Sequence, residues 1–150
     1  MLLRAKRIAA FLIDAILALV TAGFVVRLIP LFGAFLGGIV LFVYMAMRDV
    51  TGASLGKRLL GLRVVLQDGT PSTANERISR NLTVAIGPAI SLIPLAGSLG
   101  PPVWACCILI ETLVLLIKGE RLGDMFTFTK VVPKDALAVA VAPGLEGGAT

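Results

Sequence analysis

The stretch "RIAAFLIDAILALVTAGFVV", residues 7–26, opens on an arginine and then runs for a full membrane crossing with a single further charge, Asp14. A bilayer core of roughly 30 Å is crossed by about 20 such residues in a helix. The whole chain shares this character, since 57% of its 150 residues are hydrophobic, 15% are charged and the mean hydropathy is +0.96. This composition excludes an ordinary water-soluble domain and predicts an integral membrane protein.

A cleaved signal peptide is the alternative for this N-terminal segment, because basic residues precede the apolar run. Signal peptides have a hydrophobic core of about 7–15 residues, followed by a cleavage site of small residues. The apolar run here is longer, carries Asp14 and has no convincing cleavage site before the next apolar stretch. We therefore predict a transmembrane helix at about residues 8–28.

Three further apolar stretches predict an all-α integral membrane protein of two helical hairpins, with Pro30 marking the first turn. The four expected crossings are about 8–28, 31–47, 82–99 and 103–117, with a cytoplasmic loop at 48–80. Pro88 and Pro94 interrupt the third, which is expected either to kink or to break. Residues 1–132 then form one transmembrane domain, and residues 133–150 are expected to be a flexible tail.

The basic residues are distributed asymmetrically over these four helices. Of the 14 lysines and arginines, only Arg27 falls on one side, and all the others fall on the side of the termini and the loop 48–80. Cytoplasmic segments of membrane proteins carry such an excess. We therefore expect both termini in the cytoplasm. Anionic lipid headgroups account for the net charge of +5, and no motif or aromatic interleaving indicates binding to nucleic acid.

The central loop contains three segments with structural signals of their own. "SLGKRLLGL" at 54–62 is typical of a short interfacial helix with basic residues, and "STANERISRNL" at 72–82 is typical of a capped amphipathic helix. "LRVVLQDGTP" at 62–71 predicts a strand followed by a turn. "FTKVV" at 128–132 is also strand-like, so these two segments are expected to pair in a small two-stranded cytoplasmic sheet.

No enzyme is predicted. "GASLG" at 52–56 matches a nucleophile motif, but the chain has no histidine to serve as a base. "GASLGKR" is one residue too short for a phosphate-binding loop, and Arg58 occupies the place of its Ser or Thr. Cys106 and Cys107 are adjacent in an apolar helix, where they suit packing better than a disulfide or a metal site. We therefore expect no cofactor and no metal.

Helix geometry singles out two intramembrane acids. Asp14 follows Arg7 by seven residues, and Glu111 precedes Lys118 by seven, so each acid shares a helix face with a cation near the cytoplasmic interface. If the first and fourth helices are neighbours, these four residues form one buried cluster in which the carboxylates share a proton. Such a cluster is either a proton or cation site or a structural ion pair that fixes the helices.

The residues also resemble a known family. "RIAAFLID" in the first helix, "GASLGKRLLGLRVV" with "DG" in the loop, "RNL" at 80–82, and "RLGD" followed by "TKVV" together resemble the RDD family of bacterial and archaeal membrane proteins. The resemblance implies that Arg7, Asp14 and Asp124 are the naming triad. It implies exchange of sodium or other monovalent cations for protons, in a bacterial or archaeal plasma membrane. Phe128 departs from the family pattern, which more often has glycine there.

Within this resemblance, Asp124 lies on the cytoplasmic side beside Arg121. We expect it to pair with Arg7 or with the basic loop around Lys57 and Arg58, which would hold the fourth helix against the first.

Three classes of function are consistent with the sequence: a cation/proton antiporter, an accessory subunit that stabilises another membrane protein, and a sensor or lipid-interacting protein that uses the basic face. Lipid binding would depend on Lys57, Arg58 and Arg63. Four helices are few to enclose a pathway, so transport is expected to need a homo-oligomer or a membrane-protein partner. The glycines of the second helix offer a close-packing face for it.

Overall fold

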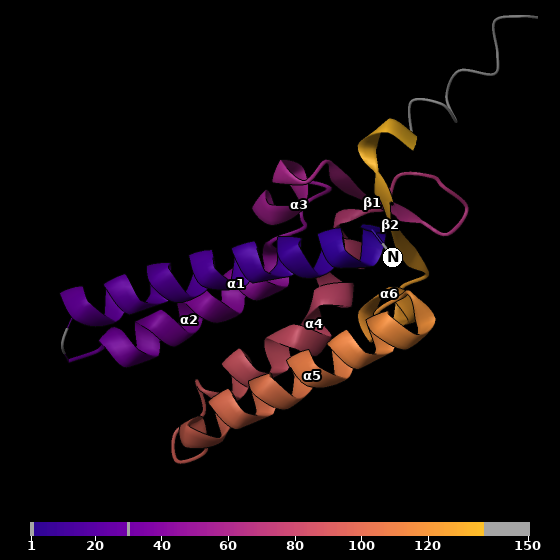
Figure 1. Cartoon of the computed structure of the whole chain (residues 1–150). Coiled ribbons are helices and arrows are strands. Elements are labelled where there is room, and N and C mark those ends of the chain that lie inside the picture. Colours follow the sequence, from indigo (N-terminus) through magenta and orange to yellow (C-terminus); the bar gives the residue numbers. More distant parts are fainter. Residues whose placement is uncertain (1, 30, 137–150) are drawn as a thin grey trace, which may run out of the picture.

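Four long helices run along most of the molecule, and a group of shorter elements gathers toward one end of them (Figure 1). The structure is a computed structural model that describes residues 2–29 and 31–136. The long helices are α1 (Leu2–Leu28), α2 (Gly33–Met47), α4 (Ala74–Ile90) and α5 (Gly100–Lys118). The shorter elements are α3 (Leu55–Leu59), β1 (Leu62–Leu66), α6 (Leu122–Phe126) and β2 (Thr129–Pro133), and a 3-10 turn, η1 (Gly97–Leu99), precedes α5. α1 packs on α2 and α4 on α5, and contacts between α2 and α4 join the two pairs.

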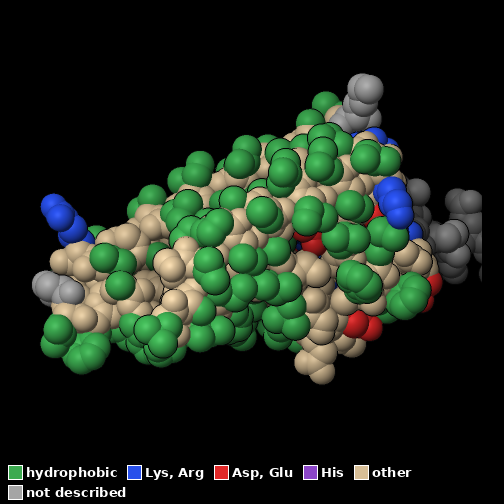
Figure 2. Space-filling view, turned by 90° about the horizontal axis from the view of Figure 1, so that it is seen from below, with side chains coloured by type: hydrophobic (Ala, Val, Ile, Leu, Met, Phe, Trp, Pro, Cys, Tyr) green, Lys and Arg blue, Asp and Glu red, His purple; other side chains and the backbone are tan. Residues whose placement is uncertain are grey.

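Two segments are long and apolar enough to cross a membrane: α1, and Gly97–Lys118, which contains α5. In their most apolar stretches the mean hydropathy is 2.4 and 2.0, and only 28% and 17% of those stretches are buried within the chain. Figure 2 shows hydrophobic side chains along the length of one face, with lysine and arginine side chains near its two ends. An outward apolar surface of this extent suits a bilayer.

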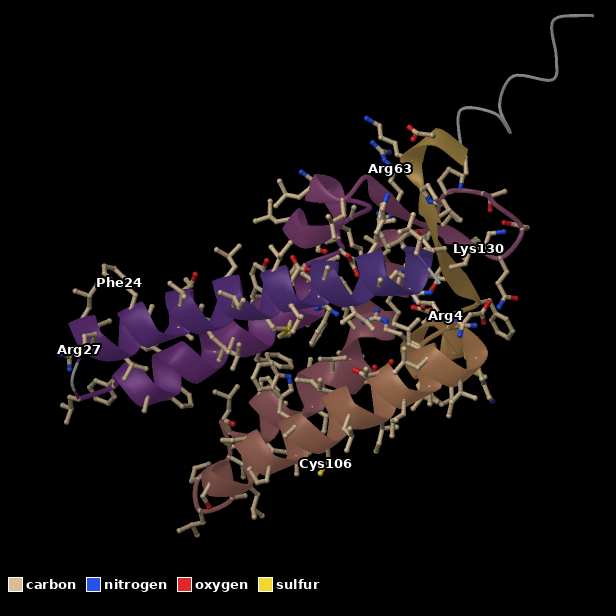
Figure 3. The ribbon with its side chains drawn as sticks, viewed as in Figure 1. Arg4, Phe24, Arg27, Arg63, Cys106 and Lys130 are labelled. Carbon is tan, nitrogen blue, oxygen red and sulfur yellow. The ribbon has the colours of Figure 1, made fainter. Side chains whose placement is uncertain are left out.

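Basic residues that the sequence assigns to opposite sides lie toward opposite ends of the helices. Arg27 lies at one end of the helices, near Phe24, whereas Arg4, Arg63 and Lys130 lie toward the other end (Figure 3). The predicted turn residue Pro30 lies outside the described residues, as do residues 137–150 of the predicted flexible tail.

The third predicted crossing, 82–99, is not one helix. The predicted amphipathic helix and the start of this crossing merge into α4, which continues through Pro88 and ends at Ile90. Its N-terminus has a capping box, in which Thr73 and Glu76 satisfy each other's backbone N–H groups. The apolar part after residue 81 rises only about 14 Å, because a helix rises 1.5 Å per residue. Pro94 disfavours helical backbone in the residue before it, so the chain turns before η1.

The predicted two-stranded sheet is present. β1 and β2 pair antiparallel, with Leu62 opposite Pro133 and Leu66 opposite Thr129. Alternate residues of the strands point to one side, and Leu62, Val64 and Val131 form a buried cluster with Ala10 of α1. The sheet therefore covers the N-terminal half of α1.

Two glycines of α2, Gly33 and Gly37, pack against α1 within the chain. A Cβ atom at Gly37 would lie 3.0 Å from the carbonyl oxygen of Ala22, and one at Gly33 would lie 2.6 Å from that of Val26. These glycines allow α2 to approach α1 closely, as small residues do between membrane helices.

Phe128 keeps the backbone conformation that glycine favours, with φ of 51°. A non-glycine residue in this left-handed region costs about 1 kcal/mol or more. We expect Phe128→Gly to be more stable than Phe126→Gly by about 1 kcal/mol, because both changes remove an exposed phenyl ring but only the first relieves the backbone. Thermal unfolding of the two variants in the same detergent measures this difference. Equal midpoints, or a lower one for Phe128→Gly, would contradict it.

Candidate functional site

Nine charged side chains are buried under the short elements, although burial of a charge is costly unless it is paired. Five are basic and four are acidic, so the group carries a net charge of about +1 if all are ionised. The residues are Arg7, Asp14, Arg48, Asp49, Lys57, Arg80, Glu111, Arg121 and Asp124. We call this group the charged core. The pairing within it differs from one acid to the next.

Asp124 is bound by three arginines from separate parts of the chain. Arg7 of α1 donates to its Oδ2 atom and Arg80 of α4 donates to Oδ1. The Nη2 atom of Arg121 lies 3.6 Å from Oδ1, and the backbone N–H of Arg121 donates to Oδ2 at 3.4 Å. Burial alone would raise the pKa of this carboxyl, but the charges of Arg80, Arg121 and Arg7 outweigh it and hold the pKa well below its usual range. Asp124 therefore stays ionised.

A glycine next to Asp124 allows this arrangement. A Cβ atom at Gly123 would lie 1.9 Å from the carbonyl oxygen of Arg80. Only glycine lets the start of α6 lie directly against α4, and this contact brings the Asp124 carboxylate to the arginine of α4. In the "LGD" segment, Gly123 therefore permits the close contact with α4, and Asp124 uses that contact to pair with Arg80.

Asp49 is the second fully paired acid. The Nζ atom of Lys57 lies 2.5 Å from its Oδ1 atom and also binds Oδ2. The backbone N–H of Ser54 donates to Oδ1 at 2.9 Å, and Asn81 donates to Oδ2 at 3.1 Å. Burial would raise the pKa of Asp49, but Lys57, Arg80 and Arg48 hold it well below the usual range. Asp49 therefore anchors the loop that carries α3.

Asp14 has hydrogen bonds to only one of its two oxygens. Its Oδ1 atom accepts the backbone N–H of Gly56 at 2.8 Å and the hydroxyl of Tyr44 at 3.4 Å. Its Oδ2 atom is buried and has no hydrogen-bond partner among the described residues. The side chain is 1% exposed. This oxygen is an open acceptor at a depth where an unsatisfied polar group is costly.

Glu111 repeats this pattern on α5. Its Oε1 atom accepts the hydroxyl of Thr83 at 2.5 Å and the backbone N–H of Gly123 at 3.3 Å. Its Oε2 atom is buried and unpartnered within residues 2–29 and 31–136. Burial alone would lower the pKa of Arg121, but the charges of Asp124 and Glu111 raise it. Glu111 and the Arg121 guanidinium are therefore close enough to interact electrostatically.

Asp14 and Glu111 line the same cavity, a partly open space of about 30 Å³ between α1 and α5. This volume suffices for about two water molecules, or for a small cation with one. Arg7, Arg48, Lys57 and Arg121 also line it. The described part of the chain has no group of three or more metal-binding side chains. What the cavity offers chemically is two carboxylates, each with one free oxygen.

The structure corrects the predicted cluster of Asp14, Glu111, Arg7 and Lys118. Arg7 pairs with Asp124, the first of the predicted pairings, and also donates to the carbonyl oxygen of Gly119 at 2.9 Å. Lys118 is exposed and forms no ion pair with any described residue.

The other basic residues predicted to support the site differ in their burial and in their partners. Lys57, predicted as an interfacial residue, is buried against Asp49, whereas Arg58 is exposed and binds Thr51. Arg121 is buried beside Asp124 as expected. Lys57 faces inward because the close contact of Gly56 with α1 turns that side of α3 toward the core.

The sequence reasoning missed Arg48, Asp49, Arg80 and Asn81. Asn81 links the first two, since it accepts from Arg48 at 3.3 Å and donates to Asp49. The available signal was the position of these pairs, "RD" at the end of one apolar stretch and "RN" at the start of another. Arginines there were counted only for orientation, although buried polar residues beside them would have suggested pairing.

Comparison with known proteins agrees with the sequence motifs. The family model described as RDD family matches residues 3–128, which include every residue of the charged core. No curated protein and no solved structure matches the chain.

Proposed function

The chain belongs to the RDD family of membrane proteins, and from this premise we propose that it exchanges a monovalent cation for protons, with Asp14 as the residue that carries the proton. The exchange takes place across a bacterial or archaeal plasma membrane. In this proposal the protein is multi-pass with both termini in the cytoplasm, and the charged core lies at the cytoplasmic ends of the helices. The segment around η1 completes the third crossing, which α4 alone is too short to make.

One observation carries the proposal: the four buried acids fall into two kinds. Asp124 and Asp49 are saturated by cations and hydrogen bonds, so they have a structural role. Asp14 and Glu111 each keep one buried oxygen without a partner, and both line one cavity. Among the described residues, Asp124 and Asp49 have no such oxygen. Two carboxylates that can take up protons or a cation are what exchange requires.

The charge balance of the cavity supports exchange over tight cation storage. Of the four cations that line the cavity, Arg7 and Lys57 pair with Asp124 and Asp49, and Arg121 also lies beside Asp124. Arg48 forms no ion pair with any described residue and is left to face the two acids. A cation that enters is therefore repelled once the acids regain protons. This competition couples the two ions, because protonation of the acids removes the negative charge that attracts the cation.

Loss of exchange in Asp14→Asn is the expected result in proteoliposomes that contain a pH-sensitive dye and experience a sodium or potassium gradient. Asparagine keeps the oxygen that accepts from Gly56 but cannot release a proton at this position, so we expect a loss of at least about tenfold with the fold retained. Asp68→Asn is the matched control, because Asp68 is exposed in a turn and should leave exchange unchanged.

Elution profile and thermal midpoint must first show that both variants are folded. Absence of exchange by the unaltered chain, or equal exchange by Asp14→Asn, would contradict the proposal. The three arginines around Asp124 favour a second candidate, an accessory subunit whose buried charges only fix its helices. That role predicts a stable membrane-protein partner on purification and no effect of Asp14→Asn on its binding.

A further inference from the structure

A second depression, separate from the charged core, opens on the surface formed by α3, β1 and the start of the segment after β2. Its volume is about 420 Å³, and Arg58, Arg63 and Lys134 line it together with the backbone around Gly52 and Gly61. All three cations are exposed, and none forms an ion pair within the described part of the chain. No acidic residue lines the depression. We call it the basic depression.

The walls of the basic depression are held by hydrogen bonds. Arg58 donates through Nε to the carbonyl oxygen of Ala53 at 3.1 Å and through Nη2 to Thr51. The backbone N–H of Lys134 donates to the carbonyl oxygen of Gly61 at 2.7 Å, and that of Val64 donates to Gly52 at 3.1 Å. The three cations therefore project from a fixed backbone and not from independent loops.

An exposed apolar surface adjoins these cations. Leu55 and Leu59 are 51% and 74% exposed. Arg58 and Leu59 follow Leu55 by three and four residues, so both lie on the same face of α3 as Leu55. The opposite side of α3 is fixed against α1, where Gly56 contacts the backbone of Ala10. α3 thus presents leucines and an arginine outward from the side of an apolar helix.

From this juxtaposition we infer that the basic depression binds the phosphate of an anionic phospholipid, whose acyl chain lies along Leu55 and Leu59. Three unpaired cations complement a phosphate, and leucines beside them suit the boundary between headgroups and acyl chains. A water-soluble phosphate compound would leave both leucines in contact with water. The inference does not depend on the proposed exchange function, since none of these residues belongs to the charged core.

The test titrates the purified full chain in detergent with phosphatidylglycerol and with phosphatidylcholine, and measures binding by native mass spectrometry. We expect phosphatidylglycerol to bind at least about tenfold more tightly. The triple variant Arg58→Gln, Arg63→Gln, Lys134→Gln should lose this preference. The triple variant Lys6→Gln, Arg27→Gln, Lys118→Gln is the matched control, since it removes the same charge from other exposed positions and should bind like the unaltered chain.

Two additional measurements keep the result decisive. Because Arg58 also supports its loop, the double variant Arg63→Gln, Lys134→Gln must show a reduced preference with an unchanged thermal midpoint. Leu55→Ser, Leu59→Ser should weaken phosphatidylglycerol binding at least fivefold. The inference is overturned if both lipids bind equally, if the control variant loses as much binding as the test variant, or if inorganic phosphate competes as well as the lipid does.

Discussion

Asp124→Asn is expected to destabilise the chain by about 3–5 kcal/mol, because it leaves Arg7 and Arg80 buried without their counter-ion. The asparagine amide would also direct N–H groups toward arginine N–H groups on one side. We expect a thermal midpoint in detergent lower by roughly 10 °C or more, together with a reduced yield of folded protein. This is the largest effect of a single side chain in the charged core.

A second change distinguishes loss of the counter-ion from loss of packing. Adding Arg7→Gln to Asp124→Asn removes one of the uncompensated charges, so the double variant should be more stable than Asp124→Asn alone. A lower or equal midpoint would show that the three arginines do not depend on this acid. Asp68→Asn should stay close to the unaltered chain, because its carboxylate is exposed.

The pH dependence of stability follows from the same ion pairs. The pKa values of Asp124 and Asp49 are lower in the folded chain than the ordinary 3.8, so their stabilisation is complete well above that value. It is lost as pH falls below about 4 toward the folded values. The midpoint of Asp124→Asn should accordingly fall less between pH 6 and pH 3 than that of the unaltered chain.

Gly56→Ala is expected to cost about 3 kcal/mol, the second large effect. The new Cβ atom would lie 2.1 Å from the carbonyl oxygen of Ala10, and that backbone atom cannot move aside as a flexible side chain could. α3 must move away from α1, which breaks the hydrogen bond from Gly56 to Asp14 and leaves a buried carboxylate without its backbone donor.

Gly23→Ala is the matched control for this change. It lies within α1 and has no atom within 4 Å of the added Cβ, so it should be neutral or slightly stabilising. The measurement is the thermal midpoint of both variants in one detergent. A Gly56→Ala midpoint within a degree of the Gly23→Ala value would contradict the close contact of α3 with α1.

The helices could be predicted because their signals are local. Apolar runs, the "STANE" cap and the β-branched residues of the two strands each appear within a few neighbouring residues. The end of α4 could not be placed, because Pro88 and Pro94 give the same warning, yet the helix continues through Pro88 and ends at Ile90, before Pro94. The choice between them depends on how α4 packs on α5, which no local pattern contains.

The candidate site was predictable only along each helix. The spacing of seven residues directed attention to Asp14 and Glu111 and assigned Arg7 and Lys118 as their partners. Pairing across helices is decided by close backbone contacts, and two single glycines, Gly56 and Gly123, set these contacts. Asp124 was identified from the family motif and not from spacing along a helix, because its partners lie on other helices.

The binding of Asp124 by arginines from α1 and α4 also sets an order for biosynthesis. Asp124 follows Arg7 by 117 positions, so α1 and α4 are both synthesised before the acid that neutralises their arginines. Until then the nascent chain holds two arginines without their acid, and the loop after α5 is what completes it.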